Sequence, residues 1–389
     1  MDNVVKIAVI SDLHCKYSGG KTLSEVNTYL TSDILPKPIN RNPVESLKAL
    51  IKQRNLSADL LLCPGDITDK IDIQGLVTGW DFLQQLSSSF NAKNLIATIG
   101  NHDVDSRAIH GPDKGAFDSL SRLSDVYPTP SEALNQAFWA NSYCILDEKD
   151  YIVLNINSCF NHTDSEKAKT SLIKAATIEA IKKELSALEL KNKVKVALFH
   201  HHPMHHSNID YKDGDFIDKS DELLKLLDGN FFDICIHGHK HDPRLEYKNS
   251  IAVFSAGAFS STMNILDLKA DNTFHLISVE KNQRRGIIES WIYSPKDGWK
   301  QKADTYFPCL TGFGYRVDII SLAKKIADWF NVQAKDIIFF NDVRKEFPDV
   351  AFLIPFDQEM LGQTLLRYHS LKLNPQLPNQ PEIISKLYQ

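Results

Sequence analysis

The chain has 389 residues, of which 43% are hydrophobic and 24% are charged, and its formal net charge is -5. A chain of this length can bury one large core and a smaller one, because single cores stop growing near ~250–300 residues. The acidic balance argues against sequence-independent binding of nucleic acid, which needs a strong basic field, so any role on DNA would rest on local patches.

The N-terminus and the cysteines indicate a cytoplasmic protein. The opening residues, MDNVVKIAVISDLH, contain an apolar run only about as long as a strand, and polar or charged residues end it before a membrane span could form. The sequence therefore predicts no secretory signal and no contact with a membrane. The cysteines are scattered, never paired as CxxC, and are interpreted as free buried thiols in a reducing compartment: Cys15, Cys63, Cys144, Cys159, Cys235 and Cys309.

Short apolar runs alternate with helical patterns as far as Ile236. Near-continuous apolar runs are typical of strands in sheets that are covered on both faces. The predicted strands are VVKIAVIS (4–11), DLLLC (59–63), NLIATI (94–99), YIVLNIN (151–157), VKVALF (194–199) and FDICI (232–236).

Two helices are expected between these strands. The first has Asn42 as its N-cap, Pro43 at the first helical position and Glu45 three residues after the cap, followed by an apolar face. The second helix is expected from about Ser171 to Leu190.

From Ile251 the pattern changes to consecutive strands, IAVFSAG, TMNILDL, FHLISVE and GIIESWIY, which are typical of an antiparallel edge that completes the sheets. Beyond Trp299 the apolar spacing becomes helical again, first around residues 319–330 and then from about Gln358 to Leu371. The chain is therefore divided into residues 1–305 and a small, mainly helical module of residues 306–389.

Five short motifs follow the ends of the predicted strands, which is where ligand sites form in α/β sheets. They supply carboxylate, amide and imidazole groups, a mixed set that suits Mn, Fe, Zn or Ni rather than Ca or Mg alone. The motifs are Asp12-Leu13-His14, Gly65-Asp66, Gly100-Asn101-His102-Asp103, His201-His202-Pro203 and Gly238-His239-Lys240-His241.

Each motif suits a site with two metal ions. Asp12 and His14 stand two residues apart at a strand end and can reach one ion. Asp66 has two carboxylate oxygens and can bridge two cations about 3.5–4 Å apart. Alone, each Asp or Asn would more often be a turn or cap residue, but the motifs occur together and in order.

In this order the motifs resemble the signature of the calcineurin-like metallophosphoesterases, D-x-H, G-D, G-N-H-D, H and G-H-x-H. The resemblance extends from about Lys6 to Trp299, and its late strands are similar to those of bacterial members related to cyclic-nucleotide phosphodiesterases. It implies a four-layer α/β/β/α sandwich in the α/β class, with two divalent metal ions. It also implies hydrolysis of a small phosphate ester through attack by a hydroxide that bridges the ions.

The resemblance also assigns residues. Asp12, His14, Asp66 and His241 match the first metal site, and Asp66, Asn101, His201 and His239 match the second. His102 matches a histidine that contacts the phosphoryl group and protonates the leaving oxygen, and Asp69 is similar in position to a carboxylate that orients it. Alignment on Pro203 selects His201 as a ligand, whereas a shift by one residue would select His200.

Three functions are compatible with these motifs. The motifs favour a phosphodiesterase or phosphatase acting on a small nucleotide-like or other organophosphate ester. A DNA nuclease would use the same motifs, but the chain lacks interleaved aromatic and basic residues typical of strand-binding grooves. A non-catalytic metal-binding scaffold would be expected to lose ligands, and none is lost. The apolar helix faces in residues 306–389 fit either a homodimer contact or packing onto the larger part.

Overall fold

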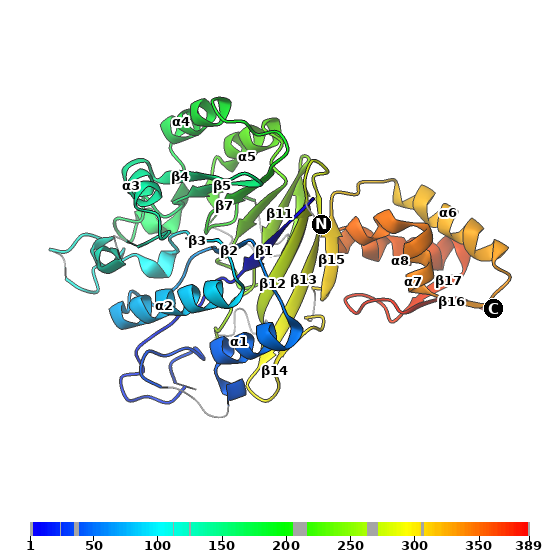
Figure 1. The fold of residues 1–389 in the computed structure, drawn as a ribbon, viewed down its shortest axis with the longest axis horizontal. Helices are drawn as coiled ribbons and strands as arrows, with labels where there is room; N and C mark the ends of the chain where they lie inside the picture. The colour runs from blue at the N-terminus through cyan, green and yellow to red at the C-terminus, as the bar shows by residue number, and fades with distance from the viewer. Residues whose placement is uncertain are drawn as a thin grey trace.

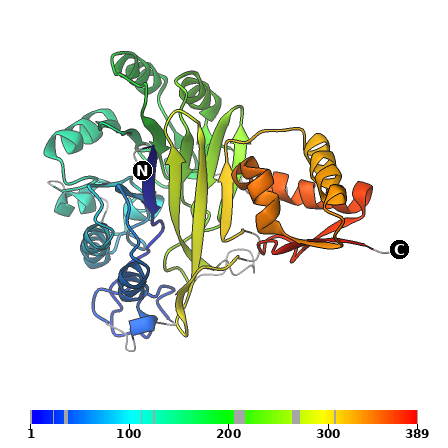
Figure 2. The ribbon, with the colours of Figure 1, turned by 45° about the vertical axis from the view of Figure 1, so that its right-hand side comes forward.

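The computed structural model describes residues 3–23, 25–34, 39–111, 113–123, 126–204, 216–262, 271–304 and 307–387. Two large mixed sheets form most of the molecule, and residues from α6 onward lie to one side of them (Figures 1 and 2). The α/β class predicted from the sequence is confirmed.

The first large sheet has the order β14-β13-β12-β1-β2-β3, with β15 paired beside β13. β1, β2 and β3 are parallel, while β12 runs antiparallel to β1. Its strands are β1 (Val4–Val9), β2 (Leu60–Cys63), β3 (Asn94–Ala97), β12 (Asn272–Glu280), β13 (Arg285–Ser294), β14 (Gly298–Lys300) and β15 (Leu310–Phe313).

The second large sheet has the order β10-β11-β9-β7-β5-β4. Its four central strands, β11, β9, β7 and β5, are parallel, and an antiparallel strand closes each edge. Its strands are β4 (Tyr143–Asp147), β5 (Tyr151–Ile156), β7 (Val194–Leu198), β9 (Ile234–His237), β10 (Arg244–Lys248) and β11 (Ile251–Ser255).

Helices cover the outer faces of both sheets (Figure 1). α1 (Pro43–Arg54), α2 (Ile73–Ser89) and α3 (Glu132–Asn141) contribute to the core cluster of the first sheet, and α4 (Ala175–Ser186) and α5 (Ser220–Gly229) to that of the second. The strands β6 (Ser171–Leu172) and β8 (Ile217–Asp218) form a separate pair.

The side chains of β1 alternate between two buried clusters, one on each face of the strand. Val5, Ile7 and Val9 share one buried cluster with residues of the second sheet, such as Val196, whereas Ala8 belongs to the cluster beneath α1 and α2. This division follows from the alternation of side chains along a strand. Both faces of each central strand are thus buried, as their continuous apolar sequences predict.

The six strands predicted before Ile236 are all present, and α1 begins at Pro43 with Asn42 as its N-cap, as expected. The helix predicted from about Ser171 to Leu190 is shorter, because Ser171 and Leu172 pair as a strand before α4 begins. The strand predicted at TMNILDL falls mostly on residues 263–270, which lie outside the described residues.

The C-terminal residues are less helical than predicted. α6 (Ile319–Val332), α7 (Phe340–Glu346) and α8 (Pro355–His369) accompany a three-stranded sheet of β16 (Ile337–Phe339), β18 (Ile383–Lys386) and β17 (Leu371–Asn374). These elements bury a cluster of their own. β15, although it lies beyond residue 305, belongs to the first large sheet.

Among the described residues, none of the helices combines the length and the apolarity needed to cross a lipid bilayer.

Candidate metal centre

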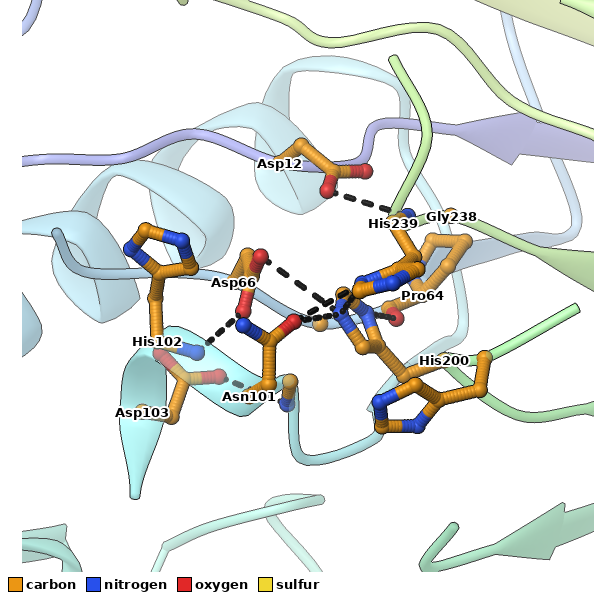
Figure 3. Close-up of polar contacts among 12 residues, drawn as sticks. Asp12, Pro64, Asp66, Asn101, His102, Asp103, His200, Gly238 and His239 are labelled. Atoms are coloured by element: carbon orange, nitrogen blue, oxygen red, sulfur yellow. Dashed lines mark hydrogen bonds and ion pairs between the residues drawn. The ribbon is translucent and has the colours of Figure 1, made fainter. Parts of the chain in front are cut away.

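The predicted ligands meet where parallel strands of both sheets end. β1, β2 and β3 lead into Asp12, Asp66 and Asn101, while β7 and β9 lead into His200 and His239 (Figure 3). The carboxyl ends of parallel strands share one edge of a sheet, so residues far apart in the chain converge there.

The backbone at this edge adopts an uncommon conformation. A positive φ is costly for residues other than glycine and persists where the surrounding structure enforces it, typically at functional sites. Five predicted ligands have it: Asp12 (51°), His14 (48°), Asp66 (52°), His239 (80°) and His241 (55°). Gly65 has a φ of 107°, and a Cβ on Gly238 would overlap the carboxylate of Asp12, so glycine is required beside these turns.

Asp12, His14, Asp66 and His241 form a buried group whose ligand atoms lie within 4.8 Å of one another. The Nε2 atoms of His14 and His241 are 2.8 Å apart. The His241 Nε2 lies 3.4 Å from Asp12 Oδ1, and the His14 Nε2 lies 3.9 Å from Asp66 Oδ2. Within the described part of the chain, neither Nδ1 of these two histidines has a hydrogen-bond partner. The convergence of ring nitrogens and carboxylate oxygens fits a divalent cation.

A second group is built around the amide oxygen of Asn101. This oxygen is 2.9 Å from His200 Nε2 and 2.8 Å from His239 Nδ1, and those two nitrogens are 3.3 Å apart. The Asp66 Oδ2 lies 3.5 Å from His200 Nε2 (Figure 3), so the carboxylate of Asp66, a member of the first group, also borders the second. His200 Nδ1 lies 2.8 Å from the carbonyl oxygen of Pro64, and by donating to it leaves the Nε2 lone pair free to bind a cation.

His201 also borders this second group, because one ligand atom from each of His200, His201 and His239 lies within 4.8 Å of the others. Its ring is buried and its centroid is 4.7 Å from that of His239. Its Nδ1, however, lies 3.0 Å from Ser158 Oγ and 3.8 Å from Cys159 Sγ. The ring nitrogen nearest to Asn101 Oδ1 on this segment is Nε2 of His200, the alternative to His201.

Burial strongly affects the protonation of the site. Loss of solvent raises the pKa of Asp66 well above its usual value; nearby Asp12 and Asp103 reinforce the effect and His102 opposes it. Burial likewise lowers the pKa of His14 and His239 well below the usual value, so their rings are neutral, as metal ligands must be. Burial opposes ionisation of Asp12, but His241 and His200 outweigh it and lower its pKa. Cations would stabilise the ionised form of Asp66.

His102 stands at the rim of the first group and its ring is held by Asp69. Its Nδ1 is 3.0 Å from Asp69 Oδ1, and its backbone N–H donates to Asp66 Oδ1 over 2.7 Å. Burial opposes its protonation, but Asp66 and Asp69 raise the pKa of His102. Burial also opposes ionisation of Asp69, yet hydrogen bonds from His102 and Lys16 lower its pKa to about 2.

Two supporting residues were not predicted from the sequence. Lys16 donates to Asp69 Oδ2 over 2.8 Å and so fixes the carboxylate that holds His102. Ser158 Oγ accepts the backbone N–H groups of His200 (3.3 Å) and His201 (3.2 Å). Ser158 follows β5, whose carboxyl end lies at the same edge as the motifs, and this position is the signal that could have revealed it.

Residues 5–243, more than half of the chain, match the family described as Calcineurin-like phosphoesterase. Among solved structures, purple acid phosphatase PPD1 from yellow lupin (Lupinus luteus) seeds matches with a TM-score of 0.50 and 14% identity over 77% of this chain and 52% of that one. A dimetal phosphatase from Danio rerio matches with a TM-score of 0.47 and 12% identity over 78% of this chain and 98% of that one.

The chain therefore spans about half the length of the lupin phosphatase. At this identity the likeness concerns the fold. No curated protein sequence matches the chain.

Proposed function

The chain belongs to the calcineurin-like phosphoesterase family, and we propose that it hydrolyses a small organic phosphate ester, with a preference for diesters, by means of two divalent metal ions. Asp12, His14, Asp66 and His241 would hold the first ion. Asp66, Asn101, His200 and His239 would hold the second.

One observation carries this proposal: the carboxylate of Asp66 lies between the histidine nitrogens of the first group and those of the second group. Asp66 Oδ2 lies 3.9 Å from His14 Nε2 and 3.5 Å from His200 Nε2, so one side chain borders both sets. A carboxylate in this position can hold two cations close together, the arrangement that suits in-line displacement at phosphorus. When bound, the ions would supply an activated water at neutral pH and would offset the negative charge of the phosphoryl oxygens.

The chain's own residues would orient the ester and manage its proton. His102 is positioned to donate a proton to the leaving oxygen, because Asp66 and Asp69 favour its charged form. Asp69 would keep the His102 ring in place, and Lys16 would keep Asp69 in place. Asp103 ties the two loops that carry Asp66 and Asn101, since it accepts the N–H groups of Thr68 (3.0 Å) and Gly100 (2.9 Å).

The choice of His200 replaces the ligand that alignment on Pro203 selected. His200 Nε2 lies among oxygen and nitrogen atoms of the second set, while its Nδ1 faces the Pro64 carbonyl. His201 Nδ1 faces Ser158 instead. These contacts support a shift of the ligand by one residue.

The test is hydrolysis of bis(p-nitrophenyl) phosphate and p-nitrophenyl phosphate by protein that has been stripped of metal and reloaded with Mn, Fe, Ni, Zn or Mg. We expect metal to restore cleavage, with the diester preferred, and we expect Asp66→Ala to abolish it. His369→Ala, in the last residue of α8 and outside both sets, is the control and should retain activity. A metal-loaded protein that cleaves neither ester would contradict the proposal and favour a non-catalytic scaffold, whereas cleavage of DNA alone would favour a nuclease.

Three statements stay predictions: that the metals are drawn from Mn, Fe, Zn or Ni, that the protein is cytoplasmic, and that it forms a homodimer through residues 306–389. Ile337 and Phe339 support the dimer, since these apolar side chains are 59% and 70% exposed on β16, an edge strand of the C-terminal sheet. Light scattering on the intact protein and on an Ile337→Lys variant tests it. A monomeric mass for the intact protein would contradict it.

A further inference from the structure

A third group of metal-binding side chains lies beside the two described above. β5 ends at Ile156, and the chain then carries Cys159 and His162 past the ring of His201, which follows β7. We propose that Cys159, His162 and His201 bind a third divalent ion that prefers sulfur and nitrogen ligands, such as Zn²⁺. Neither ion of the proposed catalytic pair is needed for this assignment.

The distances suit tetrahedral coordination. The ligand atoms of the three side chains lie within 4.8 Å of one another, and the Cys159 Sγ is 3.8 Å from His201 Nδ1. In a tetrahedral zinc site with usual bond lengths, sulfur and nitrogen ligands are about 3.6 Å apart. The rings of His162 and His201 meet edge to face with centroids 5.0 Å apart. Small rotations of side chains would therefore complete the site.

His162 gives the group an independent reason to bind a ligand. The side chain is 1% exposed, and among the described residues neither of its ring nitrogens completes a hydrogen bond. Burial lowers the pKa of His162 to about 4, and the nearby backbone of Thr170 opposes this lowering. Buried polar atoms are rarely left without a partner, and an ion would supply one here.

The other two side chains are as deeply buried. Cys159 is 0% exposed and His201 is 1% exposed. In the structure the hydroxyl of Ser158 lies 3.0 Å from His201 Nδ1, a hydrogen bond that an ion would replace. Thiolate and imidazole ligands together select zinc-like ions over Mg²⁺ or Ca²⁺, which prefer oxygen.

The proposed ion would join the segment after β5 to the segment after β7. His201 would then be a ligand of the third ion, which would lie on the side of its ring that faces Cys159. Because the His201 ring lies against His239, the third ion would also fix one wall of the second catalytic set. Three protein ligands leave a fourth position open for water or for a group of the substrate.

The test is the absorption spectrum and metal content of the full chain after replacement of its metal by Co²⁺. Binding through Cys159 predicts a thiolate-to-cobalt charge-transfer band, and Cys159→Ser should abolish the band and remove one equivalent of bound metal. Cys235→Ser is the matched control, because Cys235 is also a buried thiol but lies in β9, outside the group, and it should leave the band intact.

His162→Gln provides a second variant that keeps the thiol. We expect it to retain the fold, as judged by circular dichroism, while zinc at the third site is removed by a weak chelator at least tenfold more readily. The proposal is overturned if the cobalt-loaded wild-type protein has no thiolate band, if the band survives Cys159→Ser, or if His162→Gln leaves metal retention unchanged. Hydrolytic activity is not needed for any of these readings, so they stand apart from the test of the proposed function.

Discussion

Two neighbouring histidines, His200 and His201, differ in what their ring nitrogens face. His200 Nε2 adjoins Asn101 and Asp66, whereas His201 Nδ1 adjoins Ser158 and Cys159. We therefore expect His200→Ala to lower phosphodiester cleavage by more than ~100-fold, because it removes a ligand of the proposed catalytic pair. His201→Ala should lower it less, within the ~10–100-fold range expected for a supporting residue.

Steady-state kinetics with saturating metal, together with metal analysis of each variant, distinguishes the two histidines. The variants are matched in residue type, burial and position in the chain. A larger loss in His201→Ala than in His200→Ala would restore the ligand that alignment on Pro203 selects.

The loss of rate on replacing His102 is expected to depend on how strongly the leaving group needs a proton. A nitrophenolate leaves without one, whereas a phenolate, with a pKa near that of tyrosine, does so far less readily. His102→Ala should therefore slow cleavage of a phenyl ester by on the order of 10²–10⁴-fold and that of the corresponding p-nitrophenyl ester much less. The measurement is kcat for both esters in both proteins. Equal losses on the two esters would exclude a role in proton donation.

At the residue scale, motif order and strand ends together determine which side chains converge. Asp12, Asp66 and Asn101 follow three adjacent parallel strands, as their apolar neighbours indicated. The sequence favoured His201 through the alignment on Pro203 and left His200 as the alternative, because both follow β7 and a one-residue shift reverses the direction of each side chain. The contacts of His200 with Pro64 and Asn101 are tertiary, so no local pattern revealed them.

At the element scale, the start of α1 depends on one side chain. Asn42 Oδ1 accepts the backbone N–H groups of Val44 (2.9 Å) and Glu45 (3.1 Å). Asn42→Ala should therefore lower the free energy of unfolding by about 1 kcal/mol. Ser131, the N-cap of α3, makes no capping bond through its side chain and is the control, so Ser131→Ala should change stability little. Urea titration followed by circular dichroism measures both, and equal effects would contradict this account.

β12 contains a buried histidine that should make stability depend on pH. Burial lowers the pKa of His275 to about 3, and its Nδ1 lies 2.8 Å from Ser290 Oγ. The unfolded chain binds a proton near pH 6.5 and the folded chain does not, so this contribution is complete above pH 6.5 and is lost as the pH falls toward 3. The loss amounts to about 1.4 kcal/mol per pH unit.

The comparison is between wild type and His275→Gln, which retains a polar side chain but no group that titrates in this range. We expect the free energy of unfolding to fall less steeply in the variant between pH 6 and pH 4. Parallel slopes in the two proteins would show that His275 is protonated in the folded state or stays neutral when the chain unfolds.

Three of the elements that were not predicted from the sequence are the short strands of the C-terminal sheet. β16 has three residues, and β17 and β18 have four each, too few for alternation to be distinguished from helical spacing. These strands exist because they pair with one another over the cluster that α6 and α8 bury. Longer apolar runs such as those of β1 and β5 were predicted correctly because burial on both faces leaves an unbroken pattern.

At the scale of the whole molecule, the division at residue 305 stays a prediction, and β15, which lies beyond it, is the element that can test it. Leu310–Phe313 pairs with β13, and Phe313 is fully buried in the cluster between the two large sheets. The backbone of Gly312 also donates to the carbonyl of Leu353, so the same strand contacts the C-terminal residues. β15 thus belongs to the sandwich and connects it to the C-terminal helices and sheet.

Phe313→Ala should therefore destabilise the sandwich, by about 3–5 kcal/mol for a fully buried phenylalanine, although the residue lies beyond the predicted boundary. Phe356→Ala is the control, because that residue is 64% exposed and its loss should change stability by less than about 0.5 kcal/mol. Hydrogen exchange resolved by peptide locates the effect: faster exchange in β13 is expected for Phe313→Ala. If only α6 to β18 exchanged faster, β15 would belong energetically to the C-terminal module and the boundary at residue 305 would hold.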